Sequence, residues 1–459
     1  MIRLDRERRP EELLRSIDHL FDRSAQKIRS IERAWNPADG APVFTVDGRY
    51  RARGWTEWTQ GFEFGSALLQ FDATGDRDFL EFGRSRTIER MGSHLTHTGV
   101  HDHGFNNVST YGNLWRLARE GRFDASEGQI AFYELALKVS GAVQASRWTT
   151  IADGGFIHSF NGPHSLFVDT IRTLRAPAIA HLLGHVLHQE QDARVDLLER
   201  VLQHARATAE YSVYYGRSRD IYDVRGRVAH ESLFNVVSGT YRGPSSQQGY
   251  SPFTTWTRGL AWAMLGFAEQ VEFLQSIGAL EDFALEAARA TCDYYIEIAA
   301  ADGVPYWDSG APGLAALGDW GSRPADPFND LEPVDSSAAA IAAQGLLRLG
   351  RFLSQHGGDG ARYTQAGLLV LETLFDPGGP YVSASPEHQG LLLHSIYHRP
   401  NGWDHVPPGA RAPRGESSMW GDYHAREAAL YVQRLCAGPY LTFFGGERAL
   451  ASAASGSSS

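Results

Sequence analysis

Residues 11–28 read EELLRSIDHLFDRSAQKI, and this stretch sets the expectation for the fold. Its apolar residues Leu13, Ile17, Leu20 and Phe21 recur every three or four positions, so they share one face of a helix. Most of the remaining positions hold charged or polar residues, as on the solvent side of an amphipathic helix. The stretch therefore predicts a helix that packs its apolar face on a core.

Similar stripes recur along the chain, and long alternating runs of β-branched residues are scarce. The further helical stripes cover residues 79–91, 126–143, 164–183, 193–213, 254–274, 281–299, 335–353, 363–375 and 424–435. The segments between them are rich in Gly, Pro, Asp and aromatic residues. Helices joined by such loops predict an all-α toroid. The periodicity alone would also allow a solenoid, although the sequence has no fixed-period repeat.

The bulk composition describes a globular chain with a large core. Of 459 residues, 42% are hydrophobic and 21% are charged, and no low-complexity linker divides residues 1–446. We expect one domain over that range and a flexible tail over 447–459, where the chain ends in ASAASGSSS. Two cysteines, Cys292 and Cys436, are too few for a disulfide framework or a structural zinc site.

Charge and hydropathy limit the partners that we expect. The net charge of −11 argues against a nucleic-acid binder, which normally presents a basic surface. No stretch approaches the roughly 18 consecutive apolar residues of a membrane span. The charged N-terminus lacks the apolar core of a signal peptide, so we expect a cytoplasmic protein. Its oligomeric state is left open between monomer and homodimer.

Tryptophans concentrate in or beside the loops, where they accompany Asp, His, Gln and Arg. Sugar rings present apolar C–H faces and polar rims, so carbohydrate sites combine aromatic platforms with hydrogen-bonding side chains. Core packing explains any single tryptophan as well, but so many in loops favour a sugar site. They are Trp55, Trp58, Trp148, Trp256, Trp262, Trp307, Trp320, Trp403 and Trp420.

Two histidine-rich segments raise the question of a metal. Residues 94–105, HLTHTGVHDHGF, hold four histidines and Asp102, and imidazole with carboxylate is a common ligand set. The segment lacks a HExxH arrangement, and we expect no metal there. In residues 181–188, HLLGHVLH, the three histidines are spaced as on one face of a helix, which predicts a solvated helix face.

Two carboxylates are the candidates for proton transfer. Asp102 follows His101 in a predicted loop, and Asp169 lies among apolar residues in HSLFVDTIRTL. A carboxyl group on the apolar wall of a pocket has a raised pKa and donates protons near neutrality. The alternative for Asp169 is an ordinary helix-terminal or salt-bridged residue.

Together these motifs resemble the unsaturated glucuronyl hydrolases, family 88 of the glycoside hydrolases. The most specific match is His230, then QGYS at 248–251, WTRG at 256–259 and Trp262. Further matches are VHDHGF at 100–105, VPYWDSGAP at 304–312, DSSAAAIAAQGLL from residue 335 and GESSMWGDYHAREAAL at 415–430. The chain departs from the family pattern in having Phe160 instead of a Trp, His230-Glu231-Ser232 instead of HxF, and a longer segment before His230.

The resemblance implies an (α/α)₆ barrel with a deep pocket formed by its loops. By position, Asp169 matches the general acid/base and Asp102 the second essential carboxylate. The positions that match substrate contacts are Trp58, His101, His230, Gln248, Trp256, Arg258 and Trp262, with Ser417 and Ser418 near the uronate or a sulfate. Arg258 suits a uronate because guanidinium and carboxylate form parallel hydrogen bonds.

The implied substrate is an oligosaccharide with a 4,5-unsaturated uronic acid at its non-reducing end, and the implied reaction is hydration of that double bond without a metal or cofactor. Three alternatives stay open. The first is an unsaturated rhamnogalacturonyl hydrolase of family 105, which shares the fold and chemistry. The others are a non-catalytic sugar-binding protein and a metalloenzyme that uses the histidines of 94–103.

Overall fold

The computed structural model describes residues 1–54 and 57–445. Trp55 and the expected tail at 447–459 lie outside these residues. The helices are α1 Leu14–Ala34, α2 Gln60–Thr74, α3 Arg77–Arg90, α4 Gly92–Leu95, α5 His103–Asn106, α6 Asn113–Arg119, α7 Glu127–Ser146, α8 Thr170–Thr173, α9 Arg175–Leu182, α10 Leu197–Tyr211, α11 Thr257–Ser276, α12 Asp282–Ile298, α13 Ser336–Gln355, α14 Ala361–Phe375 and α15 Met419–Cys436. The strands are β1 Phe44–Val46, β2 Arg49–Arg51, β3 Trp148–Ile151, β4 Gly154–Ile157, β5 Ser165–Phe167, β6 Leu187–His188, β7 Arg194–Val195, β8 Glu231–Phe234 and β9 Tyr241–Ser245.

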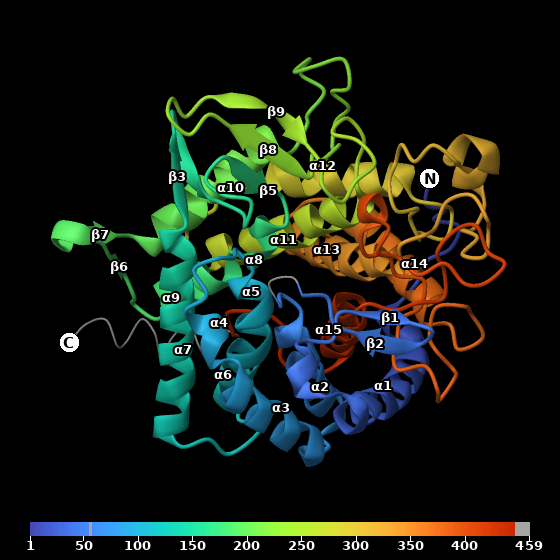
Figure 1. Ribbon diagram of the computed structural model, residues 1–459, viewed down its shortest axis with the longest axis horizontal. Helices are drawn as coiled ribbons and strands as arrows, with labels where there is room; N and C mark the ends of the chain where they lie inside the picture. Colours follow the sequence, from blue (N-terminus) through green and yellow to red (C-terminus); the bar gives the residue numbers. More distant parts are fainter. Residues whose placement is uncertain (55–56, 446–459) are drawn as a thin grey trace.

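The inner helices close a ring. Helix α2 contacts α5, α5 contacts α8, and α8 contacts α11, while α13 and α15 complete the circuit back to α2. Each inner segment pairs with an outer helix that follows it, except that α15 pairs with α1 and so joins the two ends of the chain. Figure 1 shows α11, α13 and α15 toward the middle, with α3, α7 and α12 farther out. This is the (α/α)₆ barrel, and the predicted fold class is confirmed.

The burial of the helices follows their layer. In α11 every residue from Thr257 to Val271 is buried, because this inner helix is covered on all sides. Outer helix α1 buries only one stripe, which includes the predicted Ile17, Leu20 and Phe21. Two concentric layers of helices require this difference. An outer helix buries one apolar face, whereas an inner helix is buried on all sides.

One predicted helix is wrong over part of its length. Residues 165–167 of the stripe at 164–183 form β5, which pairs antiparallel with β8, and α8 begins only after Asp169. Helix α9 ends at Leu182, and Gly184 adopts a φ of +70°, so His185 lies beyond the helix and His188 lies in β6. The helix face predicted for the three histidines therefore does not exist. Pairing with β8 outweighs the local helical pattern, because strand formation depends on partners distant in sequence.

The small sheets lie around one part of the barrel. The three-stranded sheet has the order β5-β8-β9, and the other strands form two-stranded hairpins. Figure 1 shows β3, β5, β8 and β9 together in the upper part of the view, while β6 and β7 project to the left.

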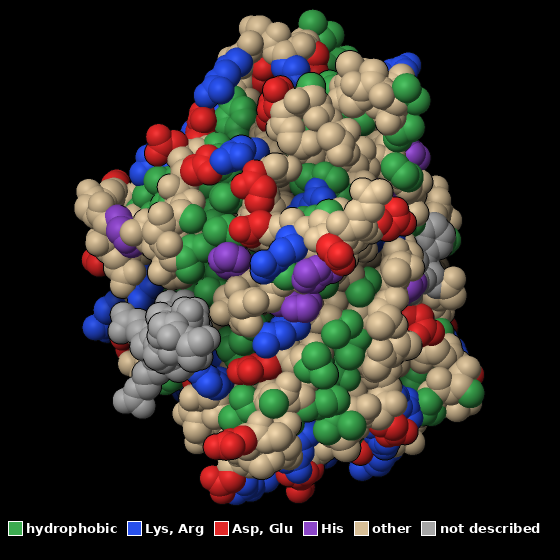
Figure 2. Space-filling view, turned by 90° about the vertical axis from the view of Figure 1, so that its left-hand side faces the viewer, with side chains coloured by type: hydrophobic (Ala, Val, Ile, Leu, Met, Phe, Trp, Pro, Cys, Tyr) green, Lys and Arg blue, Asp and Glu red, His purple; other side chains and the backbone are tan. Residues whose placement is uncertain are grey.

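On the face shown in Figure 2, acidic and basic side chains are interspersed, and its described residues form no extended patch of one sign. No helix in the described ranges combines the length and the apolar character needed to cross a bilayer.

Candidate active site

A pocket forms where the segments that precede the inner helices meet. Asp102 directly precedes α5, Asp169 precedes α8, and Trp256 precedes α11. Residues far apart in sequence therefore converge at one end of the barrel. The residues that line the pocket are Trp58, His101, Asp102, Phe160, Phe167, Asp169, Gln247, Gln248, Trp256, Arg258, Trp262, Tyr397, His398 and Trp403.

Glycine at position 104 brings the two carboxylate segments together. A Cβ atom at Gly104 would overlap the carbonyl oxygen of Thr173, so the first turn of α5 lies directly against α8. Only glycine allows this approach without displacing backbone. The approach places Asp102 and Asp169 on either side of His101.

His101 lies between the two carboxylates. Its Nε2 atom is 3.3 Å from Oδ1 of Asp169 and 3.7 Å from Oδ1 of Asp102. These contacts are close enough for ion pairs but are not aligned as hydrogen bonds. Neither ring nitrogen of His101 has a hydrogen-bond partner. All three residues are at most 8% exposed. The cluster therefore places two acids and a base in a largely desolvated pocket.

The three groups shift one another's pKa values. Burial lowers the pKa of His101, but the charges of Asp102 and Asp169 outweigh it and the net shift is upward. Burial raises the pKa of Asp102, and the charge of Asp169 raises it further, so that the net shift is upward despite His101. Burial also acts to raise the pKa of Asp169. The charge and the polar contact of His101, together with the charge of His230, outweigh burial, so the pKa lies below its ordinary value. Before substrate binds, Asp102 is thus the carboxyl that holds a proton more readily. The sequence had suggested a raised pKa for Asp169 instead.

His230 is held in one tautomer beneath the pocket wall. Its Nδ1 atom accepts backbone hydrogen bonds from Gln247 and Gln248 at 3.0 and 3.3 Å. Burial lowers its pKa to about 4, so the ring is neutral near pH 7 and carries its proton on Nε2. That Nε2 atom is buried without a hydrogen-bond partner. His230 contacts Phe167 and Trp256, which line the pocket, although its own ring does not.

Known proteins are similar to this chain over most of its length. No family model matches the sequence. The unsaturated glucuronyl hydrolase of Bacillus sp. (strain GL1) is 26% identical over 388 residues, which cover 83% of this chain and 87% of that protein. The unsaturated chondroitin disaccharide hydrolase of Streptococcus pyogenes serotype M1 is 24% identical, and the match covers 84% of each chain. The crystal structure of the Bacillus sp. GL1 enzyme superposes with a TM-score of 0.71 at 22% identity, covering 95% of this chain and 99% of that one. The chain is therefore similar to unsaturated glucuronyl hydrolases over most of its length.

Arg258 occupies the position that the family resemblance assigned to it, but its terminal donors are already used. One terminal nitrogen contacts Oδ2 of Asp335 at 3.0 Å and donates to the carbonyl of Ile396. The other donates to Oε1 of Gln248 at 2.8 Å and to the carbonyl of Tyr397 at 2.7 Å. All four terminal N–H groups are therefore occupied. This corrects the expectation of a bidentate clamp on a uronate, because only the Nε–H remains free.

These bonds instead orient the neighbouring pocket residues. Because Arg258 has donors only, its contact fixes Gln248 with the carbonyl oxygen toward the guanidinium and leaves the amide NH₂ free. Arg258 also lies over the rings of Trp256 and Trp420, at 4.6 and 4.8 Å from their centroids. Arg258 thus connects the start of α11 with the loop that ends at α15.

Two further members of the unsaturated glucuronyl hydrolase pattern lie outside the pocket. Ser417 and Ser418 are fully buried. The hydroxyl of Ser417 donates to the carbonyl of Leu392 at 2.7 Å, and that of Ser418 accepts the backbone N–H of Gly421 at 3.1 Å as the N-cap of α15. The prediction that they contact substrate is wrong for this structure, since their hydroxyls stabilise the backbone before α15.

The aromatic residues divide between the pocket wall and the layer behind it. Trp58 lines the pocket and stacks on Trp420, with ring centroids 5.0 Å apart. Trp256 and Trp262 line the pocket but are only 3% and 1% exposed. Trp420 is fully buried and supports Trp58 from behind. Trp58 therefore presents the more accessible ring.

The histidine segment at 94–103 also divides. His94 Nε2 contacts Gln60, and His103 Nδ1 contacts Ser140 at 3.0 Å, so both serve packing between helices. Only His101 reaches the pocket. The described residues contain no group of three or more His, Cys, Asp or Glu that could hold a metal ion.

Sequence reasoning missed part of the wall. Tyr397 and His398 come from a loop that no motif singled out, and Asp404 holds the backbone N–H groups of both. Burial raises the pKa of Asp404 to about 6. The signal that could have found this loop is its composition, HSIYHRPNGWD, which combines aromatic residues, histidines and turn formers as the other pocket segments do.

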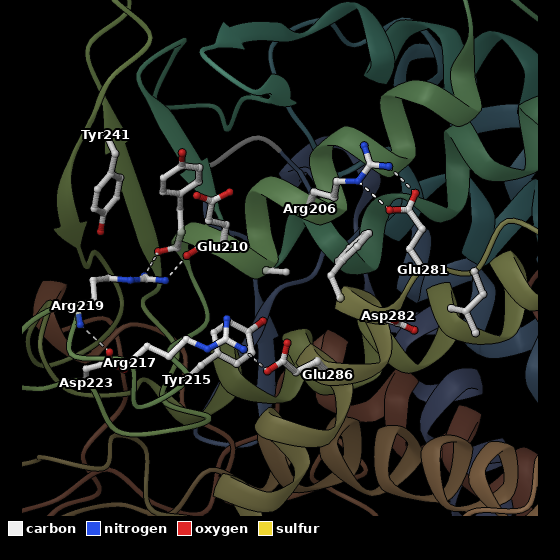
Figure 3. A pocket seen from close by; sticks show the side chains of 14 residues that line it. Arg206, Glu210, Tyr215, Arg217, Arg219, Asp223, Tyr241, Glu281, Asp282 and Glu286 are labelled. Carbon is white, nitrogen blue, oxygen red and sulfur yellow. Dashed lines mark hydrogen bonds and ion pairs between the residues drawn. The ribbon is translucent and has the colours of Figure 1, made fainter.

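A second, wider cavity lies between α10 and α12 (Figure 3). Its volume is about 1040 Å³, so size alone would favour it as the active site. However, Arg206 pairs with Glu281, Arg217 pairs with Glu286, and Arg219 donates to backbone carbonyls, as the dashed contacts in Figure 3 show. These charges neutralise one another on the surface. The pocket around His101 is therefore the candidate active site.

Proposed function

We propose that this enzyme releases 4,5-unsaturated uronate from the non-reducing end of oligosaccharides that polysaccharide lyases produce, by hydrating the C4=C5 bond. The observation that carries the proposal is the cluster of Asp102, His101 and Asp169 in a pocket walled by aromatic rings. The relatives support it, since those in Bacillus and Streptococcus are an unsaturated glucuronyl hydrolase and an unsaturated chondroitin disaccharide hydrolase.

The unsaturated uronate is an enol ether, so protonation at C4 generates an oxocarbenium ion at C5. Asp169 delivers this proton and, as the carboxylate, accepts a proton from the water that attacks C5. The resulting hemiketal opens to a 5-keto group. This leaves a hemiacetal at C1, which expels the neighbouring sugar. The separation rule for the two carboxylates of ordinary glycosidases does not govern this route.

Substrate binding supplies the condition under which Asp169 is protonated. The uronate brings a negative charge into the pocket and displaces water, and both changes raise the pKa of a nearby carboxyl. The pKa values of Asp102 and His101 are both raised next to Asp169, so the three groups take up protons as a coupled cluster. Asp102 holds a ring hydroxyl in this proposal, and Trp58, Trp256 and Trp262 face the sugar.

The donor left in the pocket wall for the uronate carboxylate is a neutral amide. The amide NH₂ of Gln248 is free because Arg258 takes its carbonyl, and His230 carries a proton on Nε2. Arg258 itself offers only Nε–H. We therefore assign Gln248 to direct recognition, Arg258 to positioning its side chain, and His230, whose ring lies behind the pocket wall, to holding its backbone.

A panel of lyase-generated disaccharides tests the function. We expect the ultraviolet absorbance of the conjugated C4=C5 bond to fall when the enzyme is added to products of glycosaminoglycan lyases. A product of a pectin lyase in the same panel separates this activity from that of the rhamnogalacturonyl type. Loss of absorbance with none of the glycosaminoglycan products would contradict the proposal.

The pH profile provides a prediction about His101. In the enzyme–substrate complex, the acid form of Asp169 is lost as the pH rises through its pKa, which limits kcat at high pH. His101 lowers that pKa against the effect of burial, so His101→Asn should move the upper limit to higher pH while kcat falls. His164→Asn, at an exposed neighbouring position, is the control and should leave the profile unchanged. An unchanged or lower limit in His101→Asn would show that His101 does not set the pKa of the acid.

A further inference from the structure

Tyr250 is an exposed ring on a fixed backbone at the rim of the pocket. Its side chain is 52% exposed. Its backbone N–H donates to Oδ2 of Asp308 at 2.9 Å, and Asp308 is completely buried. The same Asp308 side chain accepts the backbone N–H of Gly310 at 2.9 Å. The ring therefore faces solvent from an anchored position, which lowers the entropy lost when it binds a ligand.

The segment before Tyr250 is part of the pocket wall. Gln247 and Gln248 line the pocket, and their backbone N–H groups are fixed on His230. Two residues span at most roughly 7 Å, so the backbone of Tyr250 lies within about that distance of Gln248. This is comparable to the length of one sugar unit. Tyr250 is therefore within reach of a sugar that extends beyond the pocket at Gln248.

Two more exposed rings stack on each other, and one of them stands three residues after Tyr250. Phe253 and Tyr222 stack with centroids 4.8 Å apart and an interplanar angle of 28°, and they are 43% and 45% exposed. Arg227 donates to the carbonyl of Pro252 at 3.2 Å and fixes the segment from inside. Figure 1 shows the chain after β9 running toward α11 at the same end of the molecule as β5 and β8. Exposed apolar side chains gathered near a pocket are typical of a ligand-binding groove.

We propose that Tyr250, followed by Phe253 and Tyr222, binds sugars of the leaving group beyond the one attached to the uronate. The inference rests on the proposed function, because the occupant is the remainder of the same oligosaccharide. Aromatic rings stack on the C–H faces of pyranoses, and the Tyr250 hydroxyl is available to a sugar hydroxyl. The described rim at these three positions carries no charge, so it recognises sugar rings and not their anionic substituents.

The test compares an unsaturated tetrasaccharide with the disaccharide of the same polysaccharide. Tyr250→Ala should lower kcat/KM for the tetrasaccharide by about three- to tenfold, mainly through KM, since one aromatic stack contributes about that factor. Turnover of the disaccharide should stay within about twofold, because the disaccharide does not reach the rim. Tyr250→Phe should keep most of the tetrasaccharide preference, because it keeps the ring.

Matched variants separate this effect from folding. Phe132→Ala removes another exposed ring, 42% accessible on outer helix α7, and should leave both substrates unaffected. Phe253→Ala should weaken tetrasaccharide turnover only. Equal losses for the two substrates in Tyr250→Ala, or no loss for either, would overturn the inference. If the parent enzyme turned over neither substrate, the proposed function would fail, and calorimetric affinities of parent and Tyr250→Ala for the two oligosaccharides would decide the subsite alone.

Discussion

Asp169→Asn is expected to abolish measurable turnover of unsaturated disaccharides while the protein stays folded. The substitution keeps the shape of the side chain and removes the proton that the reaction needs at C4. Loss of a general acid costs on the order of 10²–10⁴ in rate, or more when the same group also acts as the base. Steady-state kinetics with the purified variant measures this loss, and substrate affinity should change little.

Two controls make the result specific. Asp153→Asn makes the same replacement of a carboxylate by an amide, on the exposed turn between β3 and β4. It should leave kcat at the parental value. A thermal melt should place Asp169→Asn close to the parent, because Asn keeps the packing of this buried position. Turnover within tenfold of the parent would remove Asp169 from the mechanism.

Arg172→Met is expected to cause the largest loss of stability that we predict. Arg172 is fully buried one turn after Asp169, where it pairs with Glu427 at 2.6 Å and with Glu269. Removing one member of a buried ion pair leaves carboxylates without a counter-charge, which costs about 3–5 kcal/mol. Denaturant-induced unfolding measures the change in the free energy of unfolding. The matched surface variant Arg206→Met, which breaks the half-exposed pair with Glu281, should lose no more than about 1 kcal/mol.

The same ion pairs predict how stability depends on pH. Burial raises the pKa of Glu427, but the charges of Arg172, His424 and Arg175 outweigh it and the net shift is downward. A carboxyl with a depressed pKa stabilises the folded state above its ordinary pKa and loses that contribution as the pH falls below it. The parent should therefore lose stability in acid more steeply than Arg172→Met. A loss below about 1 kcal/mol in Arg172→Met at neutral pH would contradict this account of the barrel core.

The helical part of the fold could be predicted because its signal is local. The stripe with Ile17 and Leu20 depends only on spacing within one helix, and the structure contains that helix as α1. The segment at 165–167 could not be predicted, because β5 exists only through its pairing with β8, whose register joins Phe167 to Glu231. Nothing near Phe167 in sequence encodes that partner.

The site shows the same division between motif and tertiary contact. Asp102 and Asp169 were found because each stands in a motif that follows the family pattern, and the structure brings both to His101. The position of Arg258 was predicted. The occupation of its terminal N–H groups by other protein atoms was not, since the partners Asp335 and Tyr397 lie far along the chain. The serines before α15 matched the pattern by position alone. Their burial depends on how the loop packs against the barrel.

The fate of solvent atoms tests the central claim most directly. Hydrolysis of an unsaturated disaccharide in H₂¹⁸O should place the label at C5 of the released uronate, and turnover in deuterium oxide should place deuterium at C4. The matching saturated glucuronide should bind but not turn over, because it has no double bond to protonate. Label at C1 of the uronate, or rapid cleavage of the saturated glucuronide, would contradict hydration of the C4=C5 bond and indicate an ordinary glycosidase mechanism in this pocket.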